Sequence, residues 1–89
     1  MTQARVAVVS RQGCHLCDIA EAIVADVCRA HYSDWTRIDV DADADLRARW
    51  GDHVPVVLVD DRVIAYWTLD AEALHRALRG EGIHPLPDL

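Results

Sequence analysis

The chain has 89 residues, a length that fits one domain and leaves no room for a second. Hydrophobic residues make up 52% of it, which is enough for a modest core and argues against an intrinsically disordered chain. The formal net charge is −6, and the cationic side chains are nine scattered arginines without any lysine, so the composition argues against nucleic-acid binding.

The apolar runs are too short for a membrane. The longest, such as residues 54–59, fall far below the roughly 20 residues that a spanning helix needs. The run Val6 to Val9 is likewise too short for the core of a signal peptide. We therefore expect a cytoplasmic protein without membrane contact. In that reducing compartment, closely spaced cysteines indicate redox or metal chemistry rather than a structural disulfide.

The first elements predicted are a buried strand over residues 5–10 and an amphipathic helix over 16–31. The strand is rich in valine without strict alternation, and the helix repeats apolar residues along one face. Between them, Gly13 gives the backbone freedom to turn. A second strand is predicted over 36–40, where apolar and polar residues alternate.

A short helix, a hairpin and a last helix are predicted next. Asp43 is a suitable N-cap for the short helix, and Gly51 fits the position after its end. The strands over 54–59 and 62–67 are separated by two aspartates, which is typical of a hairpin.

The last helix is capped by Thr68 or Asp70 and ends at Gly80. The proline-containing residues 81–89 are expected to form a flexible tail on a single domain that covers residues 1–89, with its core over about 5–80.

The element order β-α-β-α-β-β-α predicts an α/β fold. The opening β-α-β unit requires a right-handed crossover and a parallel strand pair, and the hairpin adds an antiparallel pair. The sheet should therefore be mixed and four-stranded, flanked by three helices that bury it.

The most informative motif is Cys14-His15-Leu16-Cys17, where the first strand runs into the long helix. Two thiols three residues apart face the same way, one turn apart. The free N–H groups and positive dipole of a helix start stabilise an anion, and the thiolate is the reactive form of cysteine. The motif predicts a dithiol–disulfide exchange site in which Cys14 is the nucleophile and Cys17 resolves the mixed disulfide.

This motif, the element order and the later Val54-Pro55 pair resemble the thioredoxin fold in its minimal glutaredoxin form, especially small bacterial glutaredoxin-like proteins. The resemblance covers about residues 5–80. It implies an oxidoreductase that reduces protein disulfides or glutathione mixed disulfides, with no bound cofactor. Either glutathione or a separate reductase system would supply the electrons.

The resemblance also implies roles for other residues. The family's proline is cis and faces the dithiol, so Val54 and Pro55 would line the substrate groove. Arg11 takes the place of the basic residue that meets a glutathione carboxylate, and Asp70 could hold the γ-glutamyl end. The stretch from Trp67 to Asp70 lacks the family's glycine pair, which predicts weak glutathione binding.

Alternatives remain open at this stage. His15 is a cation that favours the thiolate, an acid for the leaving thiol, or an exposed residue without a role. Trp67 either fills core or borders the groove. The rival function is a metal or iron–sulfur module in which Cys14 and Cys17 take further ligands from a second chain or from glutathione. A binding protein without turnover is a third possibility. No metal site within the chain is predicted, and a monomer is expected.

Overall fold

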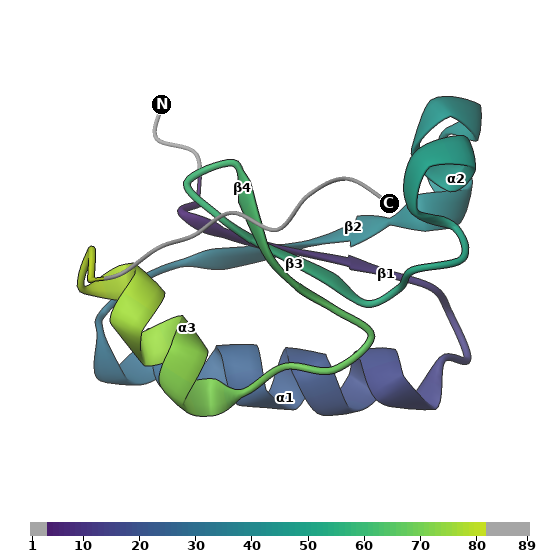
Figure 1. The fold of residues 1–89 in the computed structure, drawn as a ribbon. Coiled ribbons are helices and arrows are strands. Elements are labelled where there is room, and N and C mark those ends of the chain that lie inside the picture. Colours follow the sequence, from purple (N-terminus) through teal and green to yellow (C-terminus); the bar gives the residue numbers. More distant parts are fainter. Residues whose placement is uncertain (1–3, 82–89) are drawn as a thin grey trace.

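The computed structural model describes residues 4–81 (Figure 1). The predicted tail over 82–89 lies outside the described residues. The elements in chain order are β1 (Val6–Ser10), α1 (His15–Ala30), β2 (Trp35–Asp39), the short 3₁₀ helix η1 (Val40–Ala42), α2 (Ala44–Trp50), β3 (Val56–Val59), β4 (Arg62–Tyr66) and α3 (Ala71–Leu78). The predicted α/β element order is confirmed.

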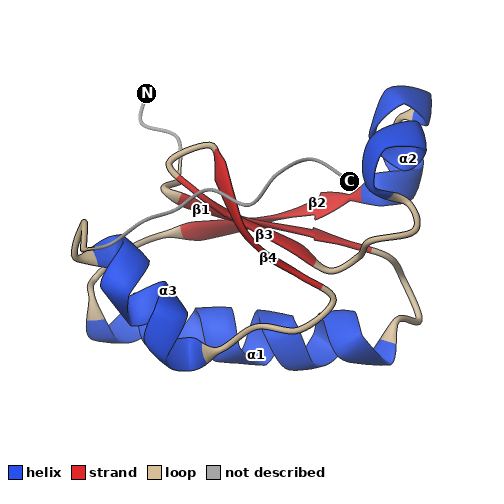
Figure 2. Ribbon diagram, in the orientation of Figure 1, coloured by secondary structure: helices blue, strands red, loops and turns tan. Residues whose placement is uncertain are grey.

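The four strands form a mixed sheet in the order β2-β1-β3-β4. The β1–β2 pair is parallel, whereas β1–β3 and β3–β4 are antiparallel, as the crossover and hairpin arguments predict. Figure 2 shows α1 and α3 together along one face of the sheet, with α2 at the end of the sheet where β2 finishes.

Two apolar clusters form the core, one on each face of the sheet. The larger one lies under α1 and α3 and contains Val6, Val8, Val24, Val27, Cys28, Val57, Val59, Ala65, Leu74, Ala77 and Leu78. The smaller one reaches α2 through Trp50 and contains Val9, Val40, Val56 and Val63. Side chains alternate between the faces of a strand, so Val6 and Val8 point towards α1 while Val9 points away.

The hairpin turn and the end of α2 differ from the simplest expectation. Asp60 and Asp61 both adopt positive φ, 51° and 67°, the combination that a type I′ turn requires. The Gly51 backbone is right-handed, with φ −57°, so it is not the left-handed cap that the sequence favours. A steric limit accounts for glycine at this position, because a Cβ there would lie 2.5 Å from the Arg47 carbonyl oxygen.

Strand ends shift slightly from their predicted positions. β2 ends at Asp39, because Val40 turns into η1 and packs in the smaller cluster. β3 begins at Val56, so the Val54–Pro55 pair precedes the strand, and the peptide bond between those two residues is cis. These shifts leave the predicted topology unchanged.

Candidate functional site

Cys14 is the N-cap of α1, at the turn that follows β1. Its backbone is extended, with φ −90° and ψ 113°, and its Sγ accepts the backbone N–H of Cys17 at 3.2 Å. The Cys14 N–H donates to the Arg11 carbonyl at 3.2 Å, and Gly13 takes the left-handed φ of 79° that closes this turn. The Cys14 sulfur therefore occupies a position where a helix start favours an anion.

The two thiols of the motif differ in access. Cys14 is half-buried, whereas Cys17, in the first turn of α1, is fully buried. Burial, followed by the hydrogen bond with Cys14, raises the pKa of Cys17 to about 11. Cys17 thus stays protonated at neutral pH, and Cys14 is the thiol of this pair that a substrate can reach.

The Val54–Pro55 pair lies at the same end of the sheet as the dithiol. In the antiparallel β1–β3 register, Val9 faces Val56, which places Pro55 beside the end of β1. Pro55 is buried and its carbonyl accepts the Trp67 backbone N–H at 2.9 Å. The turn after β1 and the entry to β3 therefore form one continuous region.

Aromatic rings extend this region beyond Pro55. The rings of His53, Tyr66 and Trp67 contact each other with centroid distances of 5.4 to 5.9 Å. Trp67 has a φ of 64°, and its indole N–H donates to the Asp52 carbonyl at 3.0 Å, which holds the half-exposed ring in place. The sequence singled out Trp67 as a possible border of the groove, and it assigned no role to Tyr66, although the Tyr66-Trp67 pair belongs to the family resemblance.

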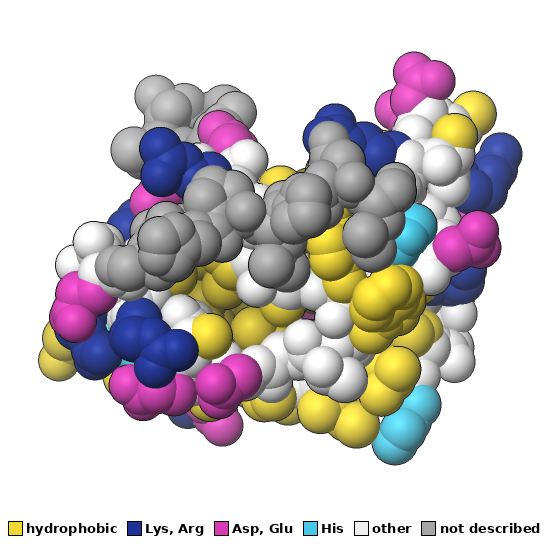
Figure 3. All heavy atoms as spheres, in the orientation of Figure 1, with side chains coloured by type: hydrophobic (Ala, Val, Ile, Leu, Met, Phe, Trp, Pro, Cys, Tyr) yellow, Lys and Arg dark blue, Asp and Glu magenta, His cyan; other side chains and the backbone are white. Residues whose placement is uncertain are grey.

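Apolar side chains on α1 lie near the dithiol as well. Leu16 and Ile19 are 44% and 46% exposed, and Trp67 is 45% exposed. Figure 3 shows hydrophobic side chains gathered over the end of the molecule where α1 begins. These side chains therefore leave exposed apolar area beside the dithiol.

Arg11 is engaged within the protein. Its Nε and Nη2 donate to the two carboxylate oxygens of Asp41 at 2.9 and 3.1 Å, and its Nη1 donates to the Gly51 carbonyl at 3.0 Å. The hydrogen bond with Arg11 lowers the pKa of Asp41, and the same bond raises the pKa of Arg11. Contact between Arg11 and glutathione stays a prediction, and it would compete with Asp41.

Asp70 and His15 both occupy helix starts. The Asp70 carboxylate caps α3 by accepting the Glu72 N–H at 3.1 Å, so this side chain already has a structural role. His15 is the exposed first residue of α1 and stands next to Cys14 in the chain. The roles of Asp70 and His15 toward a substrate stay predictions.

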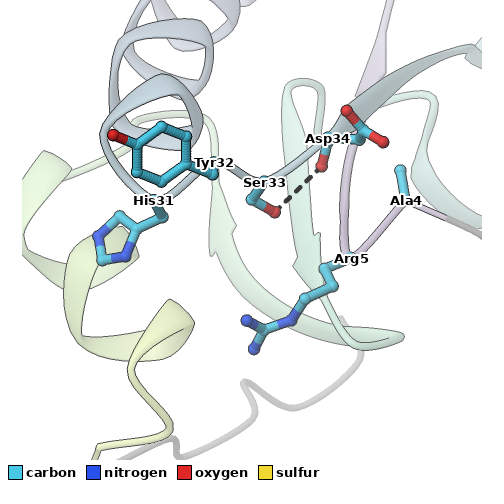
Figure 4. A pocket seen from close by; sticks show the side chains of 6 residues that line it. All are labelled: Ala4, Arg5, His31, Tyr32, Ser33 and Asp34. Carbon is cyan, nitrogen blue, oxygen red and sulfur yellow. Dashed lines mark hydrogen bonds between the residues drawn. The ribbon is translucent and has the colours of Figure 1, made fainter.

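A hollow at the opposite end of α1 contains no thiol. It is lined by Ala4, Arg5, His31, Tyr32, Ser33 and Asp34, whose side chains Figure 4 shows. Within residues 4–81, no three or more His, Cys, Asp or Glu side chains are grouped so that they could hold a metal ion. In the same part of the chain, no helix is long and apolar enough to cross a membrane.

Comparisons with known proteins agree with this arrangement. A family model described as Glutaredoxin-like domain (DUF836) matches residues 5–79. The uncharacterized protein Rv0508 of Mycobacterium tuberculosis (strain ATCC 25618 / H37Rv) is 32% identical over 93 residues, an alignment that covers 99% of this chain and 96% of that protein.

Two solved structures extend the comparison. Protein XcR50 from X. campestris has a TM-score of 0.70 and 29% identity, and the match covers 84% of this chain and 96% of that one. Wheat glutaredoxin has a TM-score of 0.53 and 20% identity, with 90% of this chain and 74% of that one covered. The likeness to wheat glutaredoxin shows a shared fold.

Proposed function

Because the chain belongs to the glutaredoxin-like family, we propose that it is a cytoplasmic thiol–disulfide oxidoreductase whose reactive pair is Cys14 and Cys17. The difference between the two thiols carries this proposal. One is half-buried at a helix start, and the other is fully buried with a pKa raised to about 11. This asymmetry supports a nucleophile followed by a resolving thiol.

The reaction would begin at Cys14. Its thiolate attacks one sulfur of a substrate disulfide, so a Cys14–substrate disulfide forms and the other substrate sulfur leaves as a thiolate. Cys17 then loses its proton and attacks the Cys14 sulfur. The bond between Cys14 and Cys17 forms, the bond to the substrate breaks, and the reduced substrate leaves.

An external dithiol or two molecules of a monothiol would reset the site. A thiolate attacks Cys14, Cys17 leaves as a thiolate and takes up a proton, and a second thiolate then frees Cys14. The two electrons lost by the reductant equal the two gained by the substrate disulfide, so no bound cofactor is required.

Protein or peptide disulfides are the substrate class that the site supports best. The Val54 backbone and Pro55 would receive an extended peptide beside Cys14, as the family resemblance implies, and Leu16, Ile19 and Trp67 add exposed apolar area.

The charged side chains that would bind glutathione already have partners within the protein. Arg11 is held by Asp41, and Asp70 caps α3. Each charge-assisted hydrogen bond withheld from a ligand weakens its binding by about tenfold or more.

A turnover assay tests the proposal. With dithiothreitol as the reductant, the protein should accelerate reduction of a protein disulfide such as that of insulin, and Cys14→Ser should return the rate to the uncatalysed level. Calorimetric titration with glutathione should show weak binding. Tight, saturable glutathione binding would contradict the preference for peptides. Stoichiometric zinc or iron held by Cys14 and Cys17, without turnover, would instead favour the metal-binding rival.

A further inference from the structure

A buried hydroxyl lies at the end of β1 next to the reactive pair. Among residues 4–81, Ser10 is the one polar or charged residue that is buried, with no exposed surface at all. Its Oγ has no hydrogen-bond partner in that part of the chain. Because an unpaired buried hydroxyl lowers stability, such a group calls for an explanation.

The strand geometry directs this hydroxyl towards Cys17. Ser10 shares a face of β1 with Val6 and Val8, and α1 covers that face. Cys17 lies in the first turn of α1 and is fully buried against the same end of β1. Ser10 is itself fully buried at this end of β1, and its hydroxyl lowers the pKa of Cys17 against the larger, opposite effect of burial.

A second donor approaches the same sulfur. A hydrogen bond from the Arg11 backbone also lowers the pKa of Cys17. The backbone of Arg11 is fixed, since its carbonyl accepts the Cys14 N–H and its guanidinium is held by Asp41 and the Gly51 carbonyl. Neutral groups of two adjacent residues thus favour the thiolate form of a buried thiol.

We propose that the Ser10 hydroxyl, together with the Arg11 backbone N–H, receives the thiolate of Cys17 whenever that sulfur becomes charged. This inference rests on the proposed function and names the group that makes its second step possible. When Cys17 is a thiol the hydroxyl is unpaired, and when Cys17 is a thiolate the hydroxyl donates to it. The unsatisfied hydroxyl is then explained, because its partner exists only during the reaction.

The donor acts in both directions of the exchange. In the resolving step, Cys17 loses its proton to solvent, Ser10 donates to the thiolate, and the sulfur then attacks Cys14 while the substrate thiolate leaves. In the resetting step, an external thiolate attacks Cys14, the Cys14–Cys17 bond breaks, and Ser10 donates to the leaving Cys17 thiolate until it takes up a proton.

A stopped-flow experiment separates the two steps. The reduced protein is mixed with dithiobis(nitrobenzoate), a disulfide that releases one coloured thiolate when Cys14 attacks and another when Cys17 resolves. Ser10→Ala should leave the first release unchanged. It should slow the second about tenfold near neutral pH, because it removes a hydrogen bond to a charged group.

The pH profile of the second release is the decisive measurement. Ser10→Ala should move its midpoint upward by about one unit, and Ser10→Thr, which keeps the hydroxyl, should restore the parent profile. Ser33→Ala is the matched control, because it removes a hydroxyl that donates to the Asp34 carbonyl beyond the far end of α1. It should change neither release.

The outcomes distinguish this inference from the proposed function. If the parent protein releases only one coloured thiolate, the dithiol mechanism itself fails. If the parent releases two and the Ser10→Ala profile overlays that of the parent, the dithiol mechanism stands and the role of Ser10 is overturned. Urea unfolding of the reduced Ser10→Ala protein should show equal or greater stability, because the unpaired hydroxyl is gone; slower resolution in a destabilised protein would point to structural damage and overturn the inference.

Discussion

Cys17 and Cys28 are both buried thiols on α1, and burial is the main cause that raises the pKa of each. Cys17 has the Cys14 sulfur one turn before it and donors at Ser10 and Arg11. Cys28 packs in the larger apolar cluster, where residues such as Val24 and Leu74 surround it. Burial alone therefore says little about what a cysteine does, and its neighbours decide whether it can take part in exchange.

The two ends of α1 have similar charged surroundings, and they differ in the access that they give to a thiol. Beyond the C-terminal end, the Arg5 guanidinium forms a two-point pair with Asp60 and donates to the Leu78 carbonyl, which ties β1 to the hairpin turn and to α3. His31 and His75 share a hydrogen bond of 2.9 Å between α1 and α3. These contacts join elements of the fold, as the bonds of Arg11 to Asp41 and to the Gly51 carbonyl do at the other end. The N-terminal end differs because it also presents a half-buried thiol to solvent.

The largest effect should come from removing a thiol at each end. Cys14→Ser should abolish disulfide reduction, because the attacking sulfur is lost, and Cys28→Ala should retain the parent rate. The measurement is the insulin reduction assay with dithiothreitol. An active Cys14→Ser protein, or an inactive but folded Cys28→Ala protein, would contradict the claim that only the thiol at the N-terminal end is needed for disulfide reduction.

Alkylation should separate the three thiols by access and ionisation. With a pKa of about 11, only about one Cys17 in a thousand is a thiolate at pH 8. Iodoacetamide should therefore modify Cys14 first, as peptide mass spectrometry of timed samples would show. Faster modification of Cys17 or Cys28 than of Cys14 would reverse the assigned order of reaction.

Alkaline pH should destabilise the reduced protein more than the oxidised one. Between about pH 9 and pH 11, folded Cys17 keeps a proton that the unfolded chain has lost, so rising pH favours unfolding. The free energy of unfolding should be unaffected by this group below pH 9 and fall by about 2–3 kcal/mol across that range.

The protein with a Cys14–Cys17 disulfide is the control for this experiment. It has no Cys17 thiol to titrate, while Cys28 contributes equally in both forms. Urea unfolding at several pH values measures the difference. Parallel pH curves for the reduced and oxidised proteins would show that Cys17 is not held protonated by burial.

The smallest effect should appear at Cys28. Cys28→Ser places a hydroxyl in the apolar cluster and should lower the free energy of unfolding by about 1–3 kcal/mol without changing turnover. Cys28→Ala keeps the site apolar and should lose less. Urea denaturation of both variants measures the difference. Equal losses for serine and alanine would mean that a hydroxyl finds a partner at this position.

Local patterns explain why the sequence predicts so much of this molecule. The helix start at Cys14, the caps at Asp43 and Asp70, and the hairpin turn depend on neighbouring residues, and all appear close to their predicted positions. The mixed sheet follows from the order of these elements and the handedness of crossovers.

Long-range pairings explain what the sequence leaves out. Arg11 meets Asp41, 30 residues away, and the acidic run around it offers several aspartates with no means of choosing among them. The left-handed backbone of Trp67 is rare for an aromatic residue, so its contact with His53 and Tyr66 has no local signal. In the sequence, Ser10 is an ordinary last residue of a strand. Its complete burial depends on tertiary packing, which the local sequence does not show.

The pairing of Arg11 with the Gly51 carbonyl bears on how this family can diverge. A side chain at Gly51 would press on the Arg47 carbonyl and come within 3.4 Å of the Arg11 Nη2. Arg11, Asp41 and Gly51 should therefore be inherited as a set, and a relative that replaces one should replace the others. Arg11 also precedes the reactive pair, and its carbonyl accepts the Cys14 N–H. A substitution at the end of α2 that displaces Arg11 would therefore change the backbone position of Cys14, although the two lie far apart in the sequence.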